Sequence, residues 1–355
     1  MNLLIWLTIL ALVRHTLSTP GTSWWLLGAS STVEQLMRDD VTTISYKAIC
    51  QNQMYLVDKQ KDLCSTDRNI LKTVAEGAAL GISECQHQFA GSRWNCPIAT
   101  NSTSLFGPVL TVNSREKAYV HAISAAGVAY SVTRGCSQGD ISDCGCDKRI
   151  KYGPTDGTFE WGGCSDDINF GEKFSREFVD AKETKRTAES LMNIHNNEAG
   201  RKHLRDNLQR MCKCHGVSGS CSIRICWRKL PDFRKVGDSL SRKFEGAHMV
   251  RMNVRKGRLR PRHRGQKYPT KNDLVYIDQS PNYCDQNSKY GIAGTRGRSC
   301  NETSNGIDGC SLLCCGRGYR TMVKEEEKDC RCKFVWCCNV KCERCIEHTE
   351  EHICN

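Results

Sequence analysis

The residues with the clearest chemical potential lie in a short stretch that four cysteines frame. Ser218 stands in Cys212-Lys-Cys-His-Gly-Val-Ser-Gly-Ser-Cys221, and the next cysteine is Cys226. If Cys214 pairs with Cys221 and Cys212 with Cys226, the two bridges form nested rungs of a β-hairpin with a glycine-rich turn. A serine at such a tip is open to modification, which makes Ser218 the first candidate site.

A serine beside histidines also suggests nucleophilic catalysis, with His215, His195 or His203 as the base. The nucleophile elbow of serine hydrolases requires Gly-x-Ser-x-Gly on a strand-to-helix turn. Here Gly216-Val-Ser-Gly-Ser220 has serine in the place of the last glycine, and the cysteines favour a hairpin. A secreted hydrolase is therefore an alternative that the pattern disfavours, and no catalytic residue is assigned.

The N-terminus predicts export. Leu3 to Val13 is an apolar run broken only by Thr8, and small residues follow at Thr16 and Ser18, so residues 1–18 are expected to be a signal peptide. No other segment approaches the roughly 20 apolar residues of a membrane span. We therefore expect a secreted protein of the extracellular space and matrix.

The 24 cysteines fit this compartment, since an oxidising environment lets disulfides persist. Twelve lie from Cys50 to Cys226 and twelve from Cys284 to Cys354, so each half can close its own bridges. Zinc is the rival explanation for cysteine pairs such as Cys342 and Cys345, but cysteines outnumber the 10 histidines and the chain carries an export signal. We expect no metal and no cofactor.

Helices are expected to position the serine hairpin. Apolar residues recur every three or four positions from Ile70 to Phe89 and from Asn113 to Tyr130, where Glu116 suggests a capping box. Further helices are predicted over Phe170 to Val179 and Glu189 to Met211. The fold class is therefore α+β and disulfide-rich, with a helical N-terminal domain over residues 19–250 and disulfide-braced hairpins.

The composition changes between Arg251 and Lys271, where nine of 21 residues are basic and none is acidic. We interpret residues 251–272 as a basic linker that binds a polyanion, heparan sulphate or anionic lipid head groups, because the export signal makes nucleic acid the wrong partner. The candidate binding residues are Arg255, Lys256, Arg258, Arg260, Arg262 and Arg264. Residues 273–355 then form a small cysteine-rich β domain that begins with a strand over Asp273 to Asp278 and is held by its cross-links.

Six stretches together resemble the Wnt family of secreted signalling glycoproteins. They occur in family order, and the match runs from about Trp24 to Cys354. Two further stretches, 232–238 and 273–278, look most like the fifth Wnt subfamily. The six stretches are Arg93-Trp-Asn-Cys96, Trp161-Gly-Gly-Cys-Ser-Asp166, Asn193-Ile-His-Asn-Asn-Glu-Ala-Gly-Arg201, Cys214-His-Gly-Val-Ser-Gly-Ser-Cys221, Leu313-Cys-Cys-Gly-Arg-Gly-Tyr319 and Lys333-Phe-Val-Trp-Cys-Cys338.

The resemblance implies a two-domain hand. A thumb-like hairpin, about 205–230, would carry a monounsaturated palmitoleoyl chain on Ser218, and a finger-like hairpin would end the C-terminal domain. Both hairpins would bind the cysteine-rich domain of a Frizzled receptor, and this binding would trigger developmental Wnt signalling. The receptor-binding residues would be Ser218, Trp336, Cys337, Cys338 and Val340.

The resemblance also implies disulfides and partners. A Porcupine-type acyltransferase and a Wntless-type carrier would act during secretion, and a co-receptor of the LDL-receptor-related or Ror/Ryk class would join Frizzled. The fifth-subfamily likeness favours a β-catenin-independent output. Cys50 and Cys64 are left to pair with each other. The implied bridges are Cys85 with Cys96, Cys136 with Cys144, Cys146 with Cys164, Cys212 with Cys226, Cys214 with Cys221 and Cys337 with Cys338.

Two sequons, at Asn101 and Asn301, predict N-glycosylation in exposed loops. The remaining alternative is a secreted matrix protein in which the disulfides only stabilise the chain. It predicts that Ser218→Ala changes nothing, whereas the ligand hypothesis predicts retained folding with lost acylation and lost Frizzled binding.

Overall fold

The structure is a computed structural model that describes residues 23–29, 45–99, 104–184 and 186–355. The predicted signal peptide and Asn101 lie outside the described residues. Two compact units are present: unit 1 contains the described residues up to Gln88 together with Ile98–Ser280, and unit 2 contains Phe89–Pro97 and Pro281–Asn355. The disulfide-rich α+β class is confirmed, with a helical N-terminal unit and a cysteine-rich β unit at the C-terminus.

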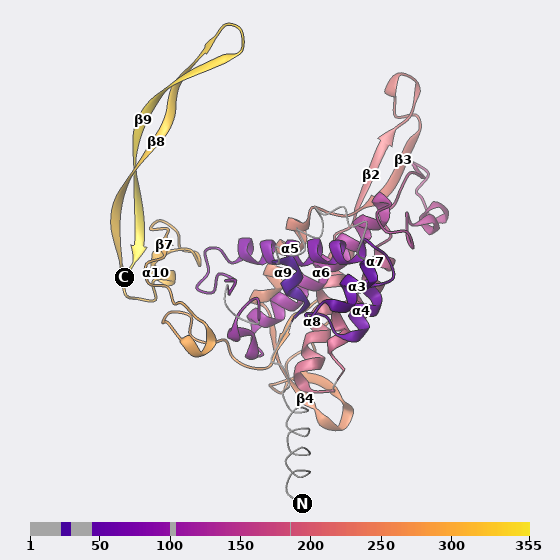
Figure 1. The fold of residues 1–355 in the computed structure, drawn as a ribbon, viewed down its shortest axis with the longest axis horizontal. Helices are drawn as coiled ribbons and strands as arrows, with labels where there is room; N and C mark the ends of the chain where they lie inside the picture. Colours follow the sequence, from indigo (N-terminus) through magenta and orange to yellow (C-terminus); the bar gives the residue numbers. More distant parts are fainter. Residues whose placement is uncertain (1–22, 30–44, 100–103, 185) are drawn as a thin grey trace, which may run out of the picture. The chain divides into compact units, whose positions relative to one another are not determined.

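Unit 1 packs its helices around α6, whose alanine, valine and isoleucine side chains are almost completely buried. Glycine allows a close approach of α5 and α6: a Cβ on Gly127 would lie 2.3 Å from the carbonyl oxygen of Gly77 on α5. Figure 1 shows α5, α6, α7 and α8 clustered together. The helices are η1 (Trp24–Gly28), α3 (Tyr46–Asn52), α4 (Asp58–Cys64), α5 (Ile70–Gln88), α6 (Arg115–Gln138), α7 (Ile168–Val179), α8 (Ala188–Asp206) and α9 (Phe233–Glu245).

All four predicted helices begin within two residues of the predicted positions, and two details differ. The residue before α6 is Ser114, without a side-chain cap, and Asn113 instead accepts a 2.9 Å hydrogen bond from Lys117 Nζ. The predicted helix over Glu189 to Met211 is too long, because α8 ends at Asp206 and a strand begins three residues later at Gln209.

Two three-stranded sheets complete unit 1. The first has the order β1-β3-β2, with β1 (Glu160–Trp161), β2 (Gln209–Cys214) and β3 (Arg224–Lys229). The second has the order β5-β4-β6, with β4 (His248–Asn253), β5 (Arg258–Pro261) and β6 (Val275–Tyr276). Short 3-10 helices lie in unit 1 at Pro108–Thr111, Lys148–Tyr152, Asp180–Lys182, Val217–Gly219 and Val254–Lys256, and in unit 2 at Ser288–Tyr290.

The second sheet corrects the predicted basic linker. The first part of the predicted linker, up to Pro261, belongs to a β-hairpin whose two strands are β4 and β5. The predicted first strand of the C-terminal domain, Asp273 to Asp278, contains β6, which pairs with β4 in the same sheet. Asn196 on α8 holds β6 by a pair of 2.9 Å hydrogen bonds with the Val275 backbone. The segment is therefore part of unit 1, and the boundary between the units falls after Ser280.

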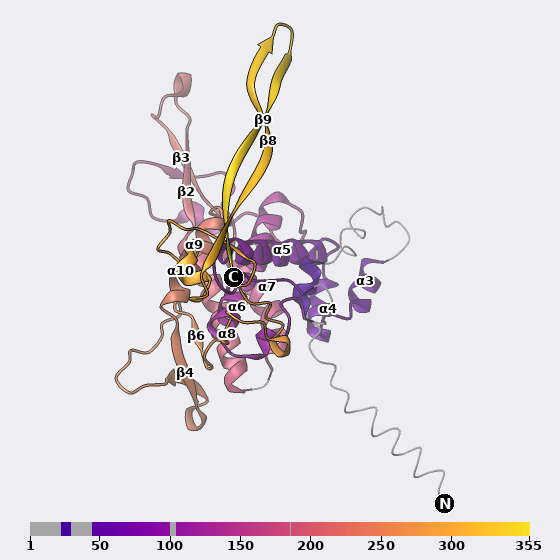
Figure 2. The ribbon, with the colours of Figure 1, turned by 90° about the vertical axis from the view of Figure 1, so that its left-hand side faces the viewer.

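Unit 2 has little apolar core. Cys310, Leu313, Cys314 and Cys354 make its buried cluster, and disulfides supply the remaining constraint. Arg298 connects the segment 89–97 to the rest of unit 2, because its guanidinium donates hydrogen bonds to three backbone carbonyls of that segment. The elements are β7 (Ser299–Cys300), α10 (Cys310–Leu313) and the long hairpin of β8 (Tyr319–Val335) and β9 (Asn339–Cys354), which Figure 2 shows as two long, twisted strands.

Among the described residues, no helix combines the length and apolar character needed to cross a membrane.

Candidate functional site: the serine hairpin

The serine hairpin is formed by β2 and β3, which pair in antiparallel register along their whole length (Figure 1). Cys212 faces Cys226 across the ladder, and these two residues are disulfide-bonded. A second disulfide joins Cys214 to Cys221 beyond the last strand pair. Both bridges that frame the serine are therefore in place, and they fix the loop from His215 to Ser220 at the end of the hairpin.

The loop places Ser218 at its apex in an uncommon conformation. The φ angle of Ser218 is 56°, in the left-handed region that non-glycine residues seldom adopt, and Gly219 follows with φ 77°. Hydrogen bonds from Gly216 N to Ser220 O (2.7 Å) and from Ser220 N to Val217 O (3.2 Å) hold the turn. Ser218 is exposed, and within the described residues its hydroxyl makes no hydrogen bond. The hydroxyl is therefore accessible from solvent.

The histidines do not form a catalytic pair with this serine. His195 Nε2 donates to the Asp273 carbonyl at 2.9 Å, and His203 contacts the Ser239 hydroxyl through Nδ1 and donates to the Asn272 carbonyl through Nε2. Burial lowers the pKa of both imidazoles. His215 lies in the loop itself, with its backbone N–H bonded to the Ile223 carbonyl. Two of the three candidate bases therefore support the fold of unit 1.

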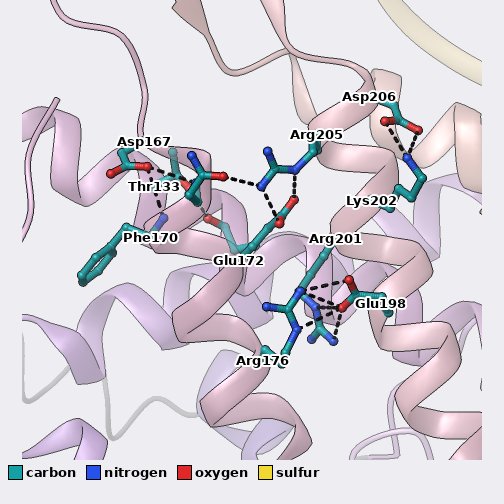
Figure 3. A network of polar contacts seen from close by, with 12 residues as sticks. Thr133, Asp167, Phe170, Glu172, Arg176, Glu198, Arg201, Lys202, Arg205 and Asp206 are labelled. Atoms are coloured by element: carbon teal, nitrogen blue, oxygen red, sulfur yellow. Dashed lines mark hydrogen bonds and ion pairs between the residues drawn. The ribbon is translucent and has the colours of Figure 1, made fainter. Parts of the chain in front are cut away.

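A polar network fixes the helices from which the hairpin rises. Figure 3 shows Arg205, near the end of α8, donating two hydrogen bonds to Glu172 on α7, at 2.7 and 2.6 Å. One turn earlier Arg201, 1% exposed, pairs with Asp180 at 2.9 Å and with Glu198 at 3.0 Å. Because β2 begins three residues after α8 ends, this network fixes the helix end that leads into the hairpin.

The network shifts the pKa values of its carboxyl groups in opposite directions. Burial raises the pKa of Asp180, although the charge of Arg201 works against that rise. Burial also acts to raise the pKa of Glu198, but the hydrogen bond from Arg176 and the charges of Arg201 and Arg176 outweigh it, so that pKa is lowered. The network therefore has a structural role, and its ionised form depends on Arg201.

A cavity of about 710 Å³ in unit 1 is separate from the hairpin. Its lining includes Trp24, Trp25 and His121. Burial is the main cause that lowers the pKa of His121 to about 3, so this imidazole is neutral near physiological pH. Ser218 does not line this cavity.

The finger hairpin of unit 2 ends in an exposed apolar tip. Trp336 is 91% exposed, and Phe334 and Val340 face each other across the strands at 69% and 63% exposure. Cys337 and Cys338 complete the turn with φ angles of 68° and 81°. Side chains this large and this open are typical of binding anchors.

The structure differs from the expected bridge between Cys337 and Cys338, which are free, exposed thiols. Neighbouring residues keep their Cβ atoms apart unless the backbone between them is distorted, and this exposed turn imposes no such packing. The other expected pairs are present: Cys50–Cys64, Cys136–Cys144, Cys146–Cys164 and the two hairpin rungs. Cys85 and Cys96 are also disulfide-bonded.

Unit 2 contains five further bridges, whose pairing the sequence did not predict: Cys284–Cys315, Cys300–Cys310, Cys314–Cys354, Cys330–Cys345 and Cys332–Cys342. The cysteines considered for zinc are thus in disulfides. Among the described residues, the sulfur atoms of Cys300, Cys314 and Cys354 come within 4.8 Å of one another, but they belong to two of these bridges.

The basic residues proposed for polyanion binding lie on the β4–β5 hairpin and the loop after it. Arg251 faces Arg260 directly across the ladder. Within the described residues, no carboxylate pairs with Arg255, Lys256 or Arg258 at 4.0 Å or less, so this hairpin keeps its positive charge. Asn301 in unit 2 is exposed, and the Thr303 hydroxyl of its sequon donates to its side-chain oxygen at 2.9 Å.

Comparison with known proteins decides the family. The model of the Wnt family matches residues 52–355. The chain belongs to the Wnt family. It is 46% identical to Protein Wnt-3a of Mus musculus over 337 residues, covering 93% of this chain and 94% of that protein. The likeness to Wnt-3a does not support the assignment to the fifth subfamily.

A solved structure agrees with this membership. A chain of the complex described as human WLS with WNT8A has a TM-score of 0.60 and 39% identity to this chain, covering 81% of this chain and 94% of that one. As a Wnt protein, the chain is a secreted, disulfide-rich signalling protein, not an enzyme, and it needs no cofactor.

Sequence reasoning missed the network beneath the hairpin. Asn196, Asn197 and Arg201 are almost fully buried, although their residue types suggest a solvent-exposed helix face. The available signal was α8 itself, whose many polar residues leave too few apolar ones for an ordinary packed face. Such a helix requires buried hydrogen bonds, which the Asp180–Arg201 pair and the Asn196–Val275 contacts supply.

Proposed function

We propose that this Wnt protein is acylated on Ser218 and binds the cysteine-rich domain of a Frizzled receptor through the serine hairpin and the finger tip. The observation that carries the proposal is the exposed Ser218 hydroxyl at the apex of a turn that two disulfides fix. A fixed apex presents the hydroxyl to an acyltransferase of the Porcupine type and later presents the acyl chain to a receptor.

The acyl chain supplies apolar surface that the turn lacks. A buried methylene contributes about 0.8 kcal/mol, so a palmitoleoyl chain contributes on the order of 10 kcal/mol before the costs of association. The finger adds Trp336, Val340 and the Cys337–Cys338 turn as a second contact. One lipid and one aromatic anchor are enough to account for a specific receptor interface.

The acyl chain must be shielded from water before the protein reaches its receptor. WNT8A is known in complex with WLS, and by likeness to it we propose a Wntless-type carrier for this chain. A co-receptor of the LDL-receptor-related or Ror/Ryk class would bind another surface. The β-catenin-independent output that the fifth-subfamily motifs predict stays a prediction, which a β-catenin reporter assay tests.

The β4–β5 hairpin supports a second role, retention in the matrix by heparan sulphate. Arg251 and Arg260 are like charges directly opposed on a sheet, an arrangement that is unfavourable without a counterion. A polyanion would relieve it. Asn301 and Asn101 are the proposed glycosylation sites.

The experiment compares Ser218→Ala with Ser220→Ala, an exposed serine two residues away in the same turn. Both variants are expected to be secreted with all disulfides formed. Ser218→Ala should lose the acyl adduct and bind the Frizzled cysteine-rich domain at least a hundredfold more weakly, because the largest apolar contact is gone. Equal binding by the two variants would contradict the proposal.

A further inference from the structure

Two disulfides of unit 2 lie against each other. Cys300 pairs with Cys310 and Cys314 pairs with Cys354, and we call these four residues the sulfur cluster. The Sγ atom of Cys314 lies 3.5 Å from the Sγ atom of Cys300, which belongs to the other bridge. Within the part of the chain that the structure describes, this is where a third sulfur comes within 4.8 Å of both sulfurs of a disulfide. The two bridges are therefore close enough to exchange partners.

The four cysteines differ in how accessible they are. Cys310, Cys314 and Cys354 are buried, at 3% exposure or less, and form the core of unit 2 together with Leu313. Cys300 is only half-buried, and it lines an open surface cavity of about 400 Å³. An external thiol can therefore reach Cys300, whereas the Cys314–Cys354 bridge is shielded from direct attack.

This arrangement suits thiol–disulfide exchange, in which a thiolate attacks one sulfur of a disulfide and displaces the other sulfur as a thiolate. Reduction of the Cys300–Cys310 bridge would turn Cys300 into such a thiolate. Its nearest target is the Sγ atom of Cys314, at 3.5 Å. The new bridge would then join Cys300 to Cys314, and Cys354 would leave as the thiolate. This second step is redox-neutral, because one disulfide breaks and one forms.

Cys354 is the residue whose release changes the structure. Its bridge fixes the end of β9 to Cys314, which directly follows α10. Its backbone carbonyl accepts a hydrogen bond from Gly297 N, and its backbone N–H donates one to the Arg298 carbonyl, both at 2.9 Å. Without the bridge, these hydrogen bonds would have to hold the end of β9 alone, and the buried core of unit 2 would lose one of its members.

We propose that the sulfur cluster is a thiol–disulfide exchange site, at which an extracellular dithiol oxidoreductase releases the end of β9. One thiolate of the dithiol attacks Cys300 Sγ and displaces Cys310. The second thiol displaces Cys300 and closes the oxidised dithiol, which has then given up two electrons and two protons. Cys300 next attacks Cys314 and displaces Cys354. The product contains a Cys300–Cys314 bridge, and the two protons end on the free thiols of Cys310 and Cys354.

The consequence for the receptor rests on the proposed function. The finger hairpin carries Trp336 at its tip, and Tyr319 pairs with Cys354 at the opposite end of the same ladder. The Cys314–Cys354 bridge is the covalent link between that end and the core of unit 2. Exchange at the sulfur cluster would loosen the base of the finger, so the finger contact with Frizzled would weaken under reducing conditions.

The test uses the full chain secreted from animal cells. In Cys310→Ser, Cys300 has lost its partner and begins as a free thiol, so no reductant is needed. The matched control is Cys315→Ser, which leaves Cys284 without its partner in the same unit. Each folded protein is kept near the ordinary thiol pKa of about 8.5 to allow exchange. It is then acidified, unfolded, labelled with N-ethylmaleimide and mapped by peptide mass spectrometry.

Cys310→Ser is expected to yield a cross-linked peptide that joins Cys300 to Cys314, together with a label on Cys354. Cys315→Ser should keep its label on Cys284. A label confined to Cys300 in the first variant would overturn the proposal. Labels spread over several bridges in the control would do the same, because exchange would then need no particular cluster.

The wild-type protein keeps the test decisive if either variant fails to fold. It is titrated with dithiothreitol, a small dithiol, until the Cys300–Cys310 bridge begins to open. Labels should appear together on Cys310 and Cys354, and the amides of Gly297 and Cys354 should exchange hydrogen about tenfold faster or more. Labels on Cys300 and Cys310 beside an intact Cys314–Cys354 bridge would overturn the proposal.

The peptide map requires no receptor, so it decides the exchange site whether or not the proposed function holds. The receptor effect is measured by titrating the exchanged wild-type protein with the isolated Frizzled cysteine-rich domain. Binding should weaken by up to about 30-fold, the loss expected when the Trp336 anchor is removed. Unchanged binding by a protein whose exchange has been mapped would overturn the link between the sulfur cluster and the finger contact.

Discussion

Replacing Arg201 by methionine tests whether the polar network holds unit 1 beneath the serine hairpin. The Arg201 side chain is 1% exposed and forms ion pairs with Asp180, which is 13% exposed, and with Glu198, which is 31% exposed. Figure 3 shows the pair of Arg201 with Glu198. Methionine fills much of the same volume but leaves both carboxylates without this partner. Breaking a buried ion pair in this way costs about 3–5 kcal/mol of unfolding free energy.

The matched control is Lys202→Met, on the next residue of α8. Lys202 pairs with Asp206 at 3.1 Å, and the two side chains are 37% and 41% exposed, so solvent screens the pair. Its loss should cost about 0.5 kcal/mol or less. The assay is urea unfolding with intact disulfides, followed by circular dichroism, with the two variants compared at unchanged slope.

The deficit of Arg201→Met should also depend on pH. Burial raises the pKa of Asp180 in the folded state, so folding favours its protonated form. At a pH above that pKa the carboxyl group is ionised, and its burial then lowers the free energy of unfolding. Without Arg201 this loss of stability increases near neutral pH and disappears once the pH falls below the ordinary aspartate pKa of about 3.9. An Arg201→Met variant within about 1 kcal/mol of Lys202→Met at neutral pH, or one whose deficit grows on acidification, would refute the reasoning.

Three further predictions follow from other parts of the chain. Gly200→Ala should cost at least about 1–3 kcal/mol in the same unfolding assay, because its Cβ would lie 1.8 Å from the Ala122 carbonyl oxygen; Gly246→Ala, with open space around it, should cost nothing, and equal values would contradict the packing argument. Trp336→Ala should leave thermal stability unchanged and weaken Frizzled binding by about 30-fold, whereas Ile346→Ala, further down the same hairpin, should do neither; equal binding by both would remove Trp336 as an anchor. Cys214→Ser/Cys221→Ser opens a disulfide loop with a sequence separation of 7, and the lost loop constraint should lower the free energy of unfolding by about 2.5 kcal/mol. Limited proteolysis should then cut the loop, and mass spectrometry should show less acylation of Ser218. Unchanged acylation would show that the bridge is not needed to present Ser218.

The sequence predicted α5 and α6 because their apolar residues repeat at helical spacing, and it predicted the serine hairpin because the cysteine spacing admits few geometries. It missed α9, although Asp232 caps the helix and Phe233, Val236, Leu240 and Phe244 are buried at helical spacing. The sequence did not reveal β4 and β5, since Arg251 and Arg258 are exposed and only Val250 and Pro261 of these two strands are fully buried.

The remaining differences depend on contacts between distant residues. The end of α8 could not be placed because its polar residues are satisfied by Asp180 and by the β6 backbone, which no local pattern reveals. The five bridges of unit 2 are equally non-local, since closely spaced cysteines admit many pairings.

The most direct test of the central claim is peptide mass spectrometry of the protein secreted from animal cells. The account predicts a monounsaturated sixteen-carbon acyl adduct on the peptide that contains Ser218, and none on Ser220 or Ser222. A protein that binds Frizzled with a bare Ser218 would contradict the account.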